Sequence, residues 1–174
     1  LFLQKYSASR YNAEVRYGLA WSLSKQREYK KALVEFAAVA ETNSALSIPA
    51  KYEQARTYQV LAQSDSALIL YLQIAELPAH NEWRDKGLFE AGRIYYEKRS
   101  LQKARDCFQT IVSKKEETAL AADAYRWLGE SAFLEKKYDE AAAYYARVVS
   151  DTMARDELRS ISLYQLGRSY FLLK

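Results

Sequence analysis

Residues 125–148 read YRWLGESAFLEKKYDEAAAYYARV and hold one copy of a pattern that recurs along the chain. A small residue, Gly129, is followed by Ala141 twelve residues later, by Tyr145 sixteen later and by Val148 nineteen later. Self-similarity at a fixed spacing is the mark of a repeat architecture. The pattern therefore has to be followed through the whole chain before any single element is assigned.

The same four positions occur in three earlier copies. These are Ala20, Ala32, Phe36 and Val39; Ala55, Ala67, Tyr71 and Ile74; and Gly92, Ala104, Phe108 and Ile111. A fifth copy opens at Gly167. The small residues are thus spaced 35, 37, 37 and 38 residues apart, which predicts about four and a half structural units.

Each unit divides into two helices, and the first helix carries an apolar stripe around the small residue. The positions four before, one before and three after it follow the period of a helix, so we predict that they form its buried face. They are Leu88, Ala91 and Tyr95; Tyr125, Leu128 and Ala132; and Leu163, Leu166 and Tyr170. Glycine inside a helix costs about 1 kcal/mol relative to alanine. Its repetition at this one position indicates close packing of the second helix.

The composition agrees with an all-α fold. Five glycines and two prolines are too few for the turns of a many-stranded protein. We predict helices near 12–25, 28–42, 47–62, 65–77, 83–97, 101–115, 119–135, 138–150 and 156–173. They form a single repeat domain, 1–174, with units near 13–42, 47–77, 83–115 and 119–150, a partial unit at 156–174, and the tail of a preceding helix at 1–8. Both ends of the array therefore look cut.

The small residue, alanine and aromatic at these offsets resemble the tetratricopeptide repeat signature. It is clearest in Trp127-Leu128-Gly129 with Tyr138, Ala141 and Tyr145. The resemblance implies a right-handed α-α superhelix, a solenoid of antiparallel helix pairs. Units longer than the usual 34 residues or so are similar to those of bacterial cell-envelope tetratricopeptide proteins. That likeness implies a periplasmic or envelope location.

A second stripe lies beside the buried one, at the positions three before, one after and four after the small residue. We call it the aromatic-arginine stripe, because eight of its fifteen residues are aromatic and four are arginine. They are Tyr17, Trp21 and Ser24; Tyr52, Arg56 and Gln59; Phe89, Arg93 and Tyr96; Arg126, Glu130 and Phe133; and Tyr164, Arg168 and Phe171. In a solenoid the first helices line the concave side. All but Ser24 and Gln59 are predicted to form a partner-binding groove.

The stripe predicts a protein or peptide partner with apolar or aromatic side chains. Family members that clamp acidic chaperone tails present Lys and Asn along this stripe, whereas this chain has residues such as Tyr17, Trp21 and Arg56. An alternative is that the aromatics only wedge between repeats. Another is an RNA-binding helical-repeat module, prompted by a pI near 9.0, although the uneven unit lengths disfavour nucleic acid. Self-association through the open repeat ends is a third.

The sequence offers no catalytic constellation. The single histidine, His80, has no Cys or carboxylate at metal-ligand spacing, and the single Cys107 has no histidine partner. There is no glycine-rich phosphate loop, and no stretch has the roughly 20 apolar residues of a membrane span. We therefore predict a non-enzymatic protein-interaction scaffold or adaptor without a cofactor or metal.

Overall fold

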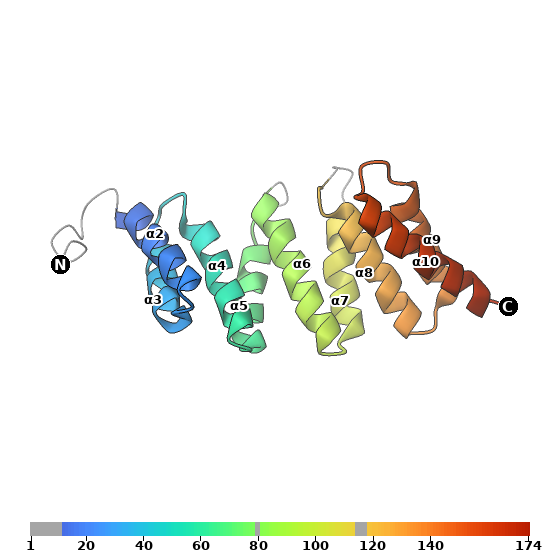
Figure 1. Ribbon diagram of the computed structural model, residues 1–174, viewed down its shortest axis with the longest axis horizontal. Coiled ribbons are helices and arrows are strands. Elements are labelled where there is room, and N and C mark those ends of the chain that lie inside the picture. The colour runs from blue at the N-terminus through green and yellow to red at the C-terminus, as the bar shows by residue number, and fades with distance from the viewer. Residues whose placement is uncertain (1–11, 79–80, 114–117) are drawn as a thin grey trace. The chain divides into compact units, whose positions relative to one another are not determined.

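The computed structural model describes residues 12–78, 81–113 and 118–174, and all of its regular structure is helical (Figure 1). Nine helices lie in this described part, labelled from α2. They are α2 (Asn12–Lys25), α3 (Tyr29–Ala40), α4 (Ser47–Val60), α5 (Ser64–Ala75), α6 (Glu82–Glu97), α7 (Leu101–Val112), α8 (Ala121–Leu134), α9 (Tyr138–Ser150) and α10 (Asp156–Leu172). Each begins and ends within three residues of its prediction. The predicted tail at 1–8 and His80 fall outside the described residues.

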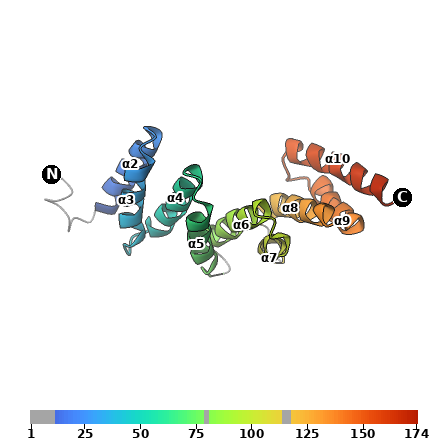
Figure 2. The same cartoon turned by 90° about the horizontal axis from the view of Figure 1, so that it is seen from below.

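Consecutive helices pack as antiparallel pairs, α2 with α3, α4 with α5, α6 with α7 and α8 with α9. The chain divides into two compact units, Leu1–Gly87 and Leu88–Lys174, which are described separately below. In the second unit, α8, α9 and α10 follow one another as neighbours, and α10 packs on both others (Figure 2). The prediction of one repeat domain stays a prediction.

The repeated positions make the core. All sixteen residues of the four complete copies are buried, and Phe36, Tyr71, Phe108 and Tyr145 are among the largest side chains with almost no exposed surface. Burying one such aromatic contributes about 1.5–3 kcal/mol. The pattern that marks the repeat in the sequence is therefore the set of contacts that holds each helix pair together.

The glycines of α6 and α8 permit this packing. A Cβ added to Gly92 would lie 2.8 Å from two ring carbons of Phe108, and one added to Gly129 would lie 2.7 Å from a ring carbon of Tyr145. A third glycine, Gly87, allows a close approach that the sequence did not reveal, because its Cβ would meet the Tyr71 carbonyl oxygen at 2.8 Å. The prediction of close approach at Gly92 and Gly129 is confirmed.

The turn within each pair has the same geometry four times without a glycine. Arg27, Ala62, Arg99 and Lys136 adopt φ values between 57° and 63°, in the left-handed region. The N–H of the following residue donates to the carbonyl five residues before it at 2.9 Å, for example Gln63 to Tyr58. This is a Schellman C-cap, which satisfies carbonyls left free at the end of the helix.

One part of the predicted buried face is wrong. On α10, Leu163 and Tyr170 are exposed and Leu166 is half-buried, whereas Leu158, Ser162 and Ser169 are buried. The equivalent residues on α6 and α8 are covered by a second helix, and no described helix takes that place beside α10. Instead α10 buries the face that it turns toward α8 and α9.

Candidate functional site

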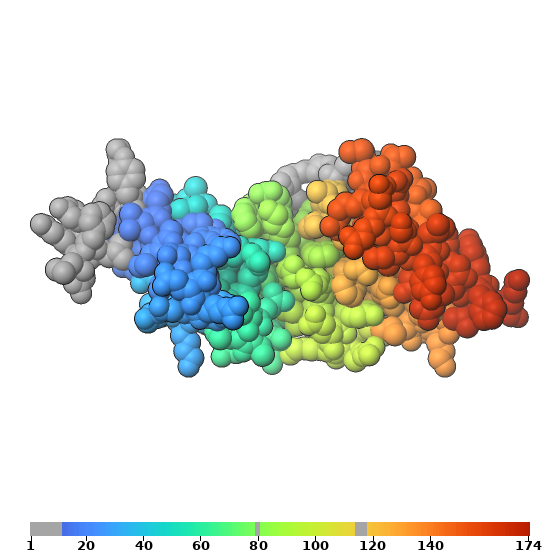
Figure 3. Space-filling view, in the orientation of Figure 1, coloured from blue at the N-terminus to red at the C-terminus, as the bar shows by residue number. Residues whose placement is uncertain are grey.

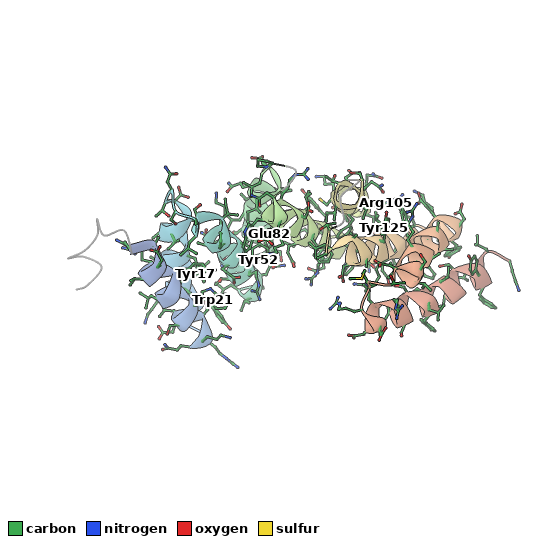
Figure 4. The ribbon with its side chains drawn as sticks, turned by 90° about the horizontal axis from the view of Figure 1, so that it is seen from above. Tyr17, Trp21, Tyr52, Glu82, Arg105 and Tyr125 are labelled. Atoms are coloured by element: carbon green, nitrogen blue, oxygen red, sulfur yellow. The ribbon has the colours of Figure 1, made fainter. Side chains whose placement is uncertain are left out.

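The aromatic-arginine stripe of the first unit lies on α2 and α4, with Tyr17 and Trp21 one turn apart on α2 and Tyr52 on α4 (Figure 4). Tyr17, Trp21 and Tyr52 are half-buried, and only Arg56 is largely exposed. Helical spacing of three and four residues brings these side chains to one side of each helix.

The aromatic rings of this unit pack on the second helices. Tyr17 and Trp21 both meet Phe36 edge-on, with ring centroids 5.7 and 6.4 Å apart. Tyr52 meets Tyr71 at 5.5 Å and Trp83 at 5.4 Å. Edge-to-face pairs at such distances contribute about 0.5–1.5 kcal/mol beyond area burial. These rings therefore support the fold and present only part of their surface outward.

Arg56 is held by its own helix. Its guanidinium donates to both carboxylate oxygens of Glu53 at 3.2 Å. Partial burial lowers the pKa of Arg56, but the neighbouring Glu53 carboxylate outweighs it, so that the pKa is raised. The charged head is thus oriented and remains accessible, with 54% of the side chain exposed.

In the second unit the α6 part of the stripe begins with Phe89, which meets Phe108 edge-on at 5.7 Å. Arg93 donates to Glu90 at 3.1 Å, the same pairing over three residues as in α4. Tyr96 meets Trp127 of α8 at 4.9 Å. Burial, and then the Glu130 carboxylate, raise the pKa of Tyr96, so its hydroxyl keeps its proton at neutral pH.

A chain of contacts continues the stripe from α8 to α10. Arg126 lies 4.5 Å from the Trp127 ring and 3.8 Å from the Glu130 carboxylate. Glu130 accepts a hydrogen bond of 3.0 Å from the Gln165 side chain, and Gln165 in turn accepts one of 2.9 Å from Arg168. Polar groups from two neighbouring first helices are therefore coupled side by side.

The last members of the stripe differ in exposure. Arg168 lies 4.8 Å from the Phe133 ring and 5.8 Å from the Tyr164 ring, which are cation-π distances. Phe133 also meets Tyr138 edge-on at 5.3 Å. Tyr164 and Phe171 are among the most exposed aromatics of the described residues.

The sequence reasoning missed the position two before the small residue. On α4, α6, α8 and α10 it holds Glu53, Glu90, Trp127 and Gln165, and each contacts the stripe arginine of its own helix. The signal was present, because Glu53-Arg56 and Glu90-Arg93 repeat an oppositely charged pair three residues apart. The net charge of the stripe together with these neighbours is therefore closer to zero than the arginines alone would give.

Candidate chemistry elsewhere is sparse. Within residues 12–78, 81–113 and 118–174, no group of three or more His, Cys, Asp and Glu side chains could hold a metal ion. Burial raises the pKa of the Cys107 thiol to about 11, and the Asp106 carboxylate adds to the shift, so the thiol is protonated at neutral pH. None of the described helices combines the length and apolarity needed to cross a bilayer.

A family model supports the repeat assignment. Residues 89–157, which run from α6 to the start of α10, match the model described as Tetratricopeptide repeat. Among curated proteins, no sequence matches the chain.

Solved structures share the fold over nearly the whole chain. One is MamA, with a TM-score of 0.73, 14% identity and coverage of 94% of this chain and 84% of that one. BtubC (BKLC) from P. vanneervenii has a TM-score of 0.73 and 17% identity over 93% of this chain and 73% of that one. A tetratricopeptide repeat protein from Parabacteroides merdae has a TM-score of 0.70 and 20% identity over 98% and 65%.

Proposed function

We propose that this array of tetratricopeptide repeats is an adaptor that binds a segment of a partner protein along the second-unit part of the aromatic-arginine stripe, from Phe89 to Phe171. The tetratricopeptide fold generally serves protein interaction. The observation that carries the specific proposal is the contact chain of the second unit. It runs from Tyr96 and Trp127 through Arg126, Glu130 and Gln165 to Arg168.

The stripe has the residue types that dominate binding energy at protein interfaces. Tyr, Trp and Arg are enriched among hot-spot residues, whose truncation costs about 2 kcal/mol or more. In this unit the arginines are oriented before any partner arrives, Arg93 by Glu90 and Arg168 by Gln165. Side chains that are already ordered lose less entropy on binding.

The pairing of the arginines also indicates the chemistry of the partner. Arg93 and Arg126 have carboxylate neighbours in Glu90 and Glu130, so a polyanion would have to compete with acids of the protein itself. A segment with apolar or aromatic side chains can cover the half-exposed rings. Its backbone carbonyls can accept hydrogen bonds from the guanidinium groups. The same local neutrality disfavours RNA, which requires unopposed cations for its phosphates.

The test is a screen of the purified chain against an array of 15-residue peptides of varied sequence. The best peptides are then measured by titration against Arg93→Ala and Tyr96→Ala. Loss of a hot-spot contact predicts binding weaker by about ten-fold or more for each variant. Circular dichroism of each variant establishes that the helices are intact.

The matched controls are Arg147→Ala and Tyr144→Ala on α9. These residues also make ring contacts with their neighbours, Arg147 and Tyr144 both with Tyr125, but they lie on a second helix outside the stripe. Binding that is equally weakened by the controls, or unchanged in Arg93→Ala and Tyr96→Ala, would place the site elsewhere. Binding of an RNA oligonucleotide that falls steeply with salt would instead favour the nucleic-acid alternative.

A further inference from the structure

The buried hydroxyl of Tyr145 has no hydrogen-bond partner among the described residues. The Tyr145 side chain on α9 is fully buried, and its hydroxyl oxygen makes no hydrogen bond within the described chain. A buried hydroxyl without a partner is destabilising, because it has lost its hydrogen bonds to water. Phenylalanine fills the equivalent position as Phe36 and Phe108. Packing alone therefore does not require the Tyr145 hydroxyl.

The second repeat shows what a tyrosine hydroxyl at this position binds. Tyr71 is the equivalent residue of α5, and its hydroxyl donates to the side-chain amide oxygen of Gln59 at 2.7 Å. Gln59 lies four residues after the small residue of α4, and the residue at that position of α8 is Phe133. A phenylalanine side chain has no acceptor. The fourth repeat therefore has the donor of this pair without the amide.

The Tyr145 hydroxyl lies close to a carboxylate of the aromatic-arginine stripe. Burial, and then the Glu130 carboxylate, raise the pKa of Tyr145, and the same carboxylate contributes to the raised pKa of Tyr96. Glu130 therefore lies near hydroxyls from both α6 and α9. In the space-filling view, part of α8 (light orange) is visible between the yellow-green of α6 and α7 and the red of α10 (Figure 3).

Glu130 already binds an amide of the protein. The Gln165 side chain of α10 donates its amide N–H to Oε1 of Glu130 at 3.0 Å. Arg126 Nη1 lies 3.8 Å from the same oxygen. Both contacts involve one of the two carboxylate oxygens, and the other can also accept hydrogen bonds. The glutamines of the protein thus show both halves of amide recognition, a carbonyl oxygen bound by a tyrosine hydroxyl and an N–H bound by a carboxylate.

We propose that Glu130 and Tyr145 form an amide site, which binds the side chain of an asparagine or glutamine in the partner segment. The amide oxygen accepts the Tyr145 hydroxyl, as Gln59 does from Tyr71, and the amide N–H donates to Glu130, as Gln165 does. A side chain is required because the hydroxyl is buried, beneath a backbone that follows the stripe. The side chains that cover it change rotamer on binding, as is common at interfaces. This inference rests on the proposed function and adds a residue preference to it.

The charges of the amide site favour an amide over an ionic side chain. Arg126 and Glu130 carry opposite charges 3.8 Å apart, so their sum is zero. A partner carboxylate would lie next to Glu130, a partner cation would lie next to Arg126, and either would also lose its water. A neutral amide avoids both costs and has the donor and the acceptor that the site requires. Glu130 and Tyr145 belong to α8 and α9, which form a complete helix pair.

The experiment uses the whole chain and the 15-residue peptide that binds it best in the array. Each residue of this peptide is replaced in turn by alanine, and binding is measured by titration. We expect one asparagine or glutamine whose replacement weakens binding by about ten-fold, because its loss leaves buried groups of the site unpaired. Tyr145→Phe should weaken binding of the unaltered peptide by about as much. It should change binding of that alanine peptide little, because the contact is already absent.

The matched control is Tyr71→Phe, the same substitution at the equivalent position of the second repeat. It removes a hydrogen bond to Gln59 that the free protein already has, so it should lower the urea midpoint and leave peptide binding unchanged. Tyr145→Phe removes a hydroxyl without a partner, so it should weaken binding and should not lower the midpoint. A purely structural role of the Tyr145 hydroxyl would give the opposite pair of results.

The outcomes separate the amide site from the proposed function. Peptide binding that depends on Arg93 and Tyr96 but tolerates Tyr145→Phe would overturn the amide site alone. A best peptide that requires no asparagine or glutamine would do the same, as would equal weakening of the unaltered and alanine peptides by Tyr145→Phe. Absence of peptide binding, or binding that does not depend on Arg93 and Tyr96, would overturn the proposed function and the amide site with it.

Discussion

The same substitution at the same position of two repeats should change stability in opposite directions. Gly129→Ala and Gly167→Ala each replace the small residue of a first helix. Either change removes the helix penalty of glycine, a gain of about 1 kcal/mol. They differ in what the new methyl group meets.

At Gly129 the methyl carbon would lie 2.7 Å from one ring carbon of Tyr145 and 2.9 Å from two others. Tyr145 is fully buried, so its ring cannot swing away without disturbing the core. Overpacking of this kind costs about 1–3 kcal/mol. When the helix gain of about 1 kcal/mol is subtracted from this cost, Gly129→Ala should lower the free energy of unfolding by up to about 2 kcal/mol. Gly167→Ala meets no neighbour and should be stabilising by up to about 1 kcal/mol.

Urea titration followed by circular dichroism measures the free energy of unfolding. A double-mutant cycle assigns the cause: in a Tyr145→Leu background the ring is gone, and Gly129→Ala should no longer destabilise. The reasoning is refuted if Gly129→Ala is as stable as the wild type, or if its cost persists without the ring.

Three other predictions test the backbone conformation of Ala62, the ion pairing of Glu135 and the burial of Cys107. Ala62→Gly should raise the free energy of unfolding by about 1 kcal/mol, because Ala62 has a φ of 57°. Ala143→Gly, on the exposed face of α9, should lower it by about as much in the same urea titration. The pKa of Glu135 is lowered, first by its hydrogen bond with Lys137, so its contribution is present above the ordinary pKa of 4.5 and is lost as the pH falls through the folded value. Glu135→Gln should therefore melt below the wild type near pH 7, with a difference that shrinks as the pH falls below 4.5 and vanishes once the pH is below the folded pKa, and a constant difference would contradict this. Since burial raises the pKa of Cys107 to about 11, iodoacetamide should label it slowly in the native state and faster in urea, and rapid native labelling would disprove its burial.

The fold could be predicted because its core and its sequence pattern are the same residues. Ala141, Tyr145 and Val148 are buried where the spacing places them, and the Tyr145 ring lies against Gly129. The backbone conformation of the turns could not be predicted from the residue types. Ala62 and Lys136 occupy left-handed C-caps that usually hold glycine, so position in the repeat, rather than residue type, determines their conformation.

The candidate site could be predicted only in part. Spacing placed Arg56 and Arg93 on one side of their helices, but their pairing with Glu53 and Glu90 depends on side-chain geometry. Pairing changes the chemistry, because an arginine next to a carboxylate attracts an anion less than a lone one does. The stripe as a binding site stays a prediction.

The wrong prediction at Leu163 and Tyr170 has a physical reason. A helical stripe shows which apolar side chains lie on one side of a helix. It does not show whether another helix buries them. Leu88 and Leu163 are the same residue in the same sequence setting, yet the first is buried and the second is exposed, because α7 packs on the Gly92 face of α6 and no described helix takes that place beside α10. Exposed apolar surface of this kind on a rigid helix favours association. The difference between the two leucines therefore comes from the described helices beside them and not from the leucines themselves.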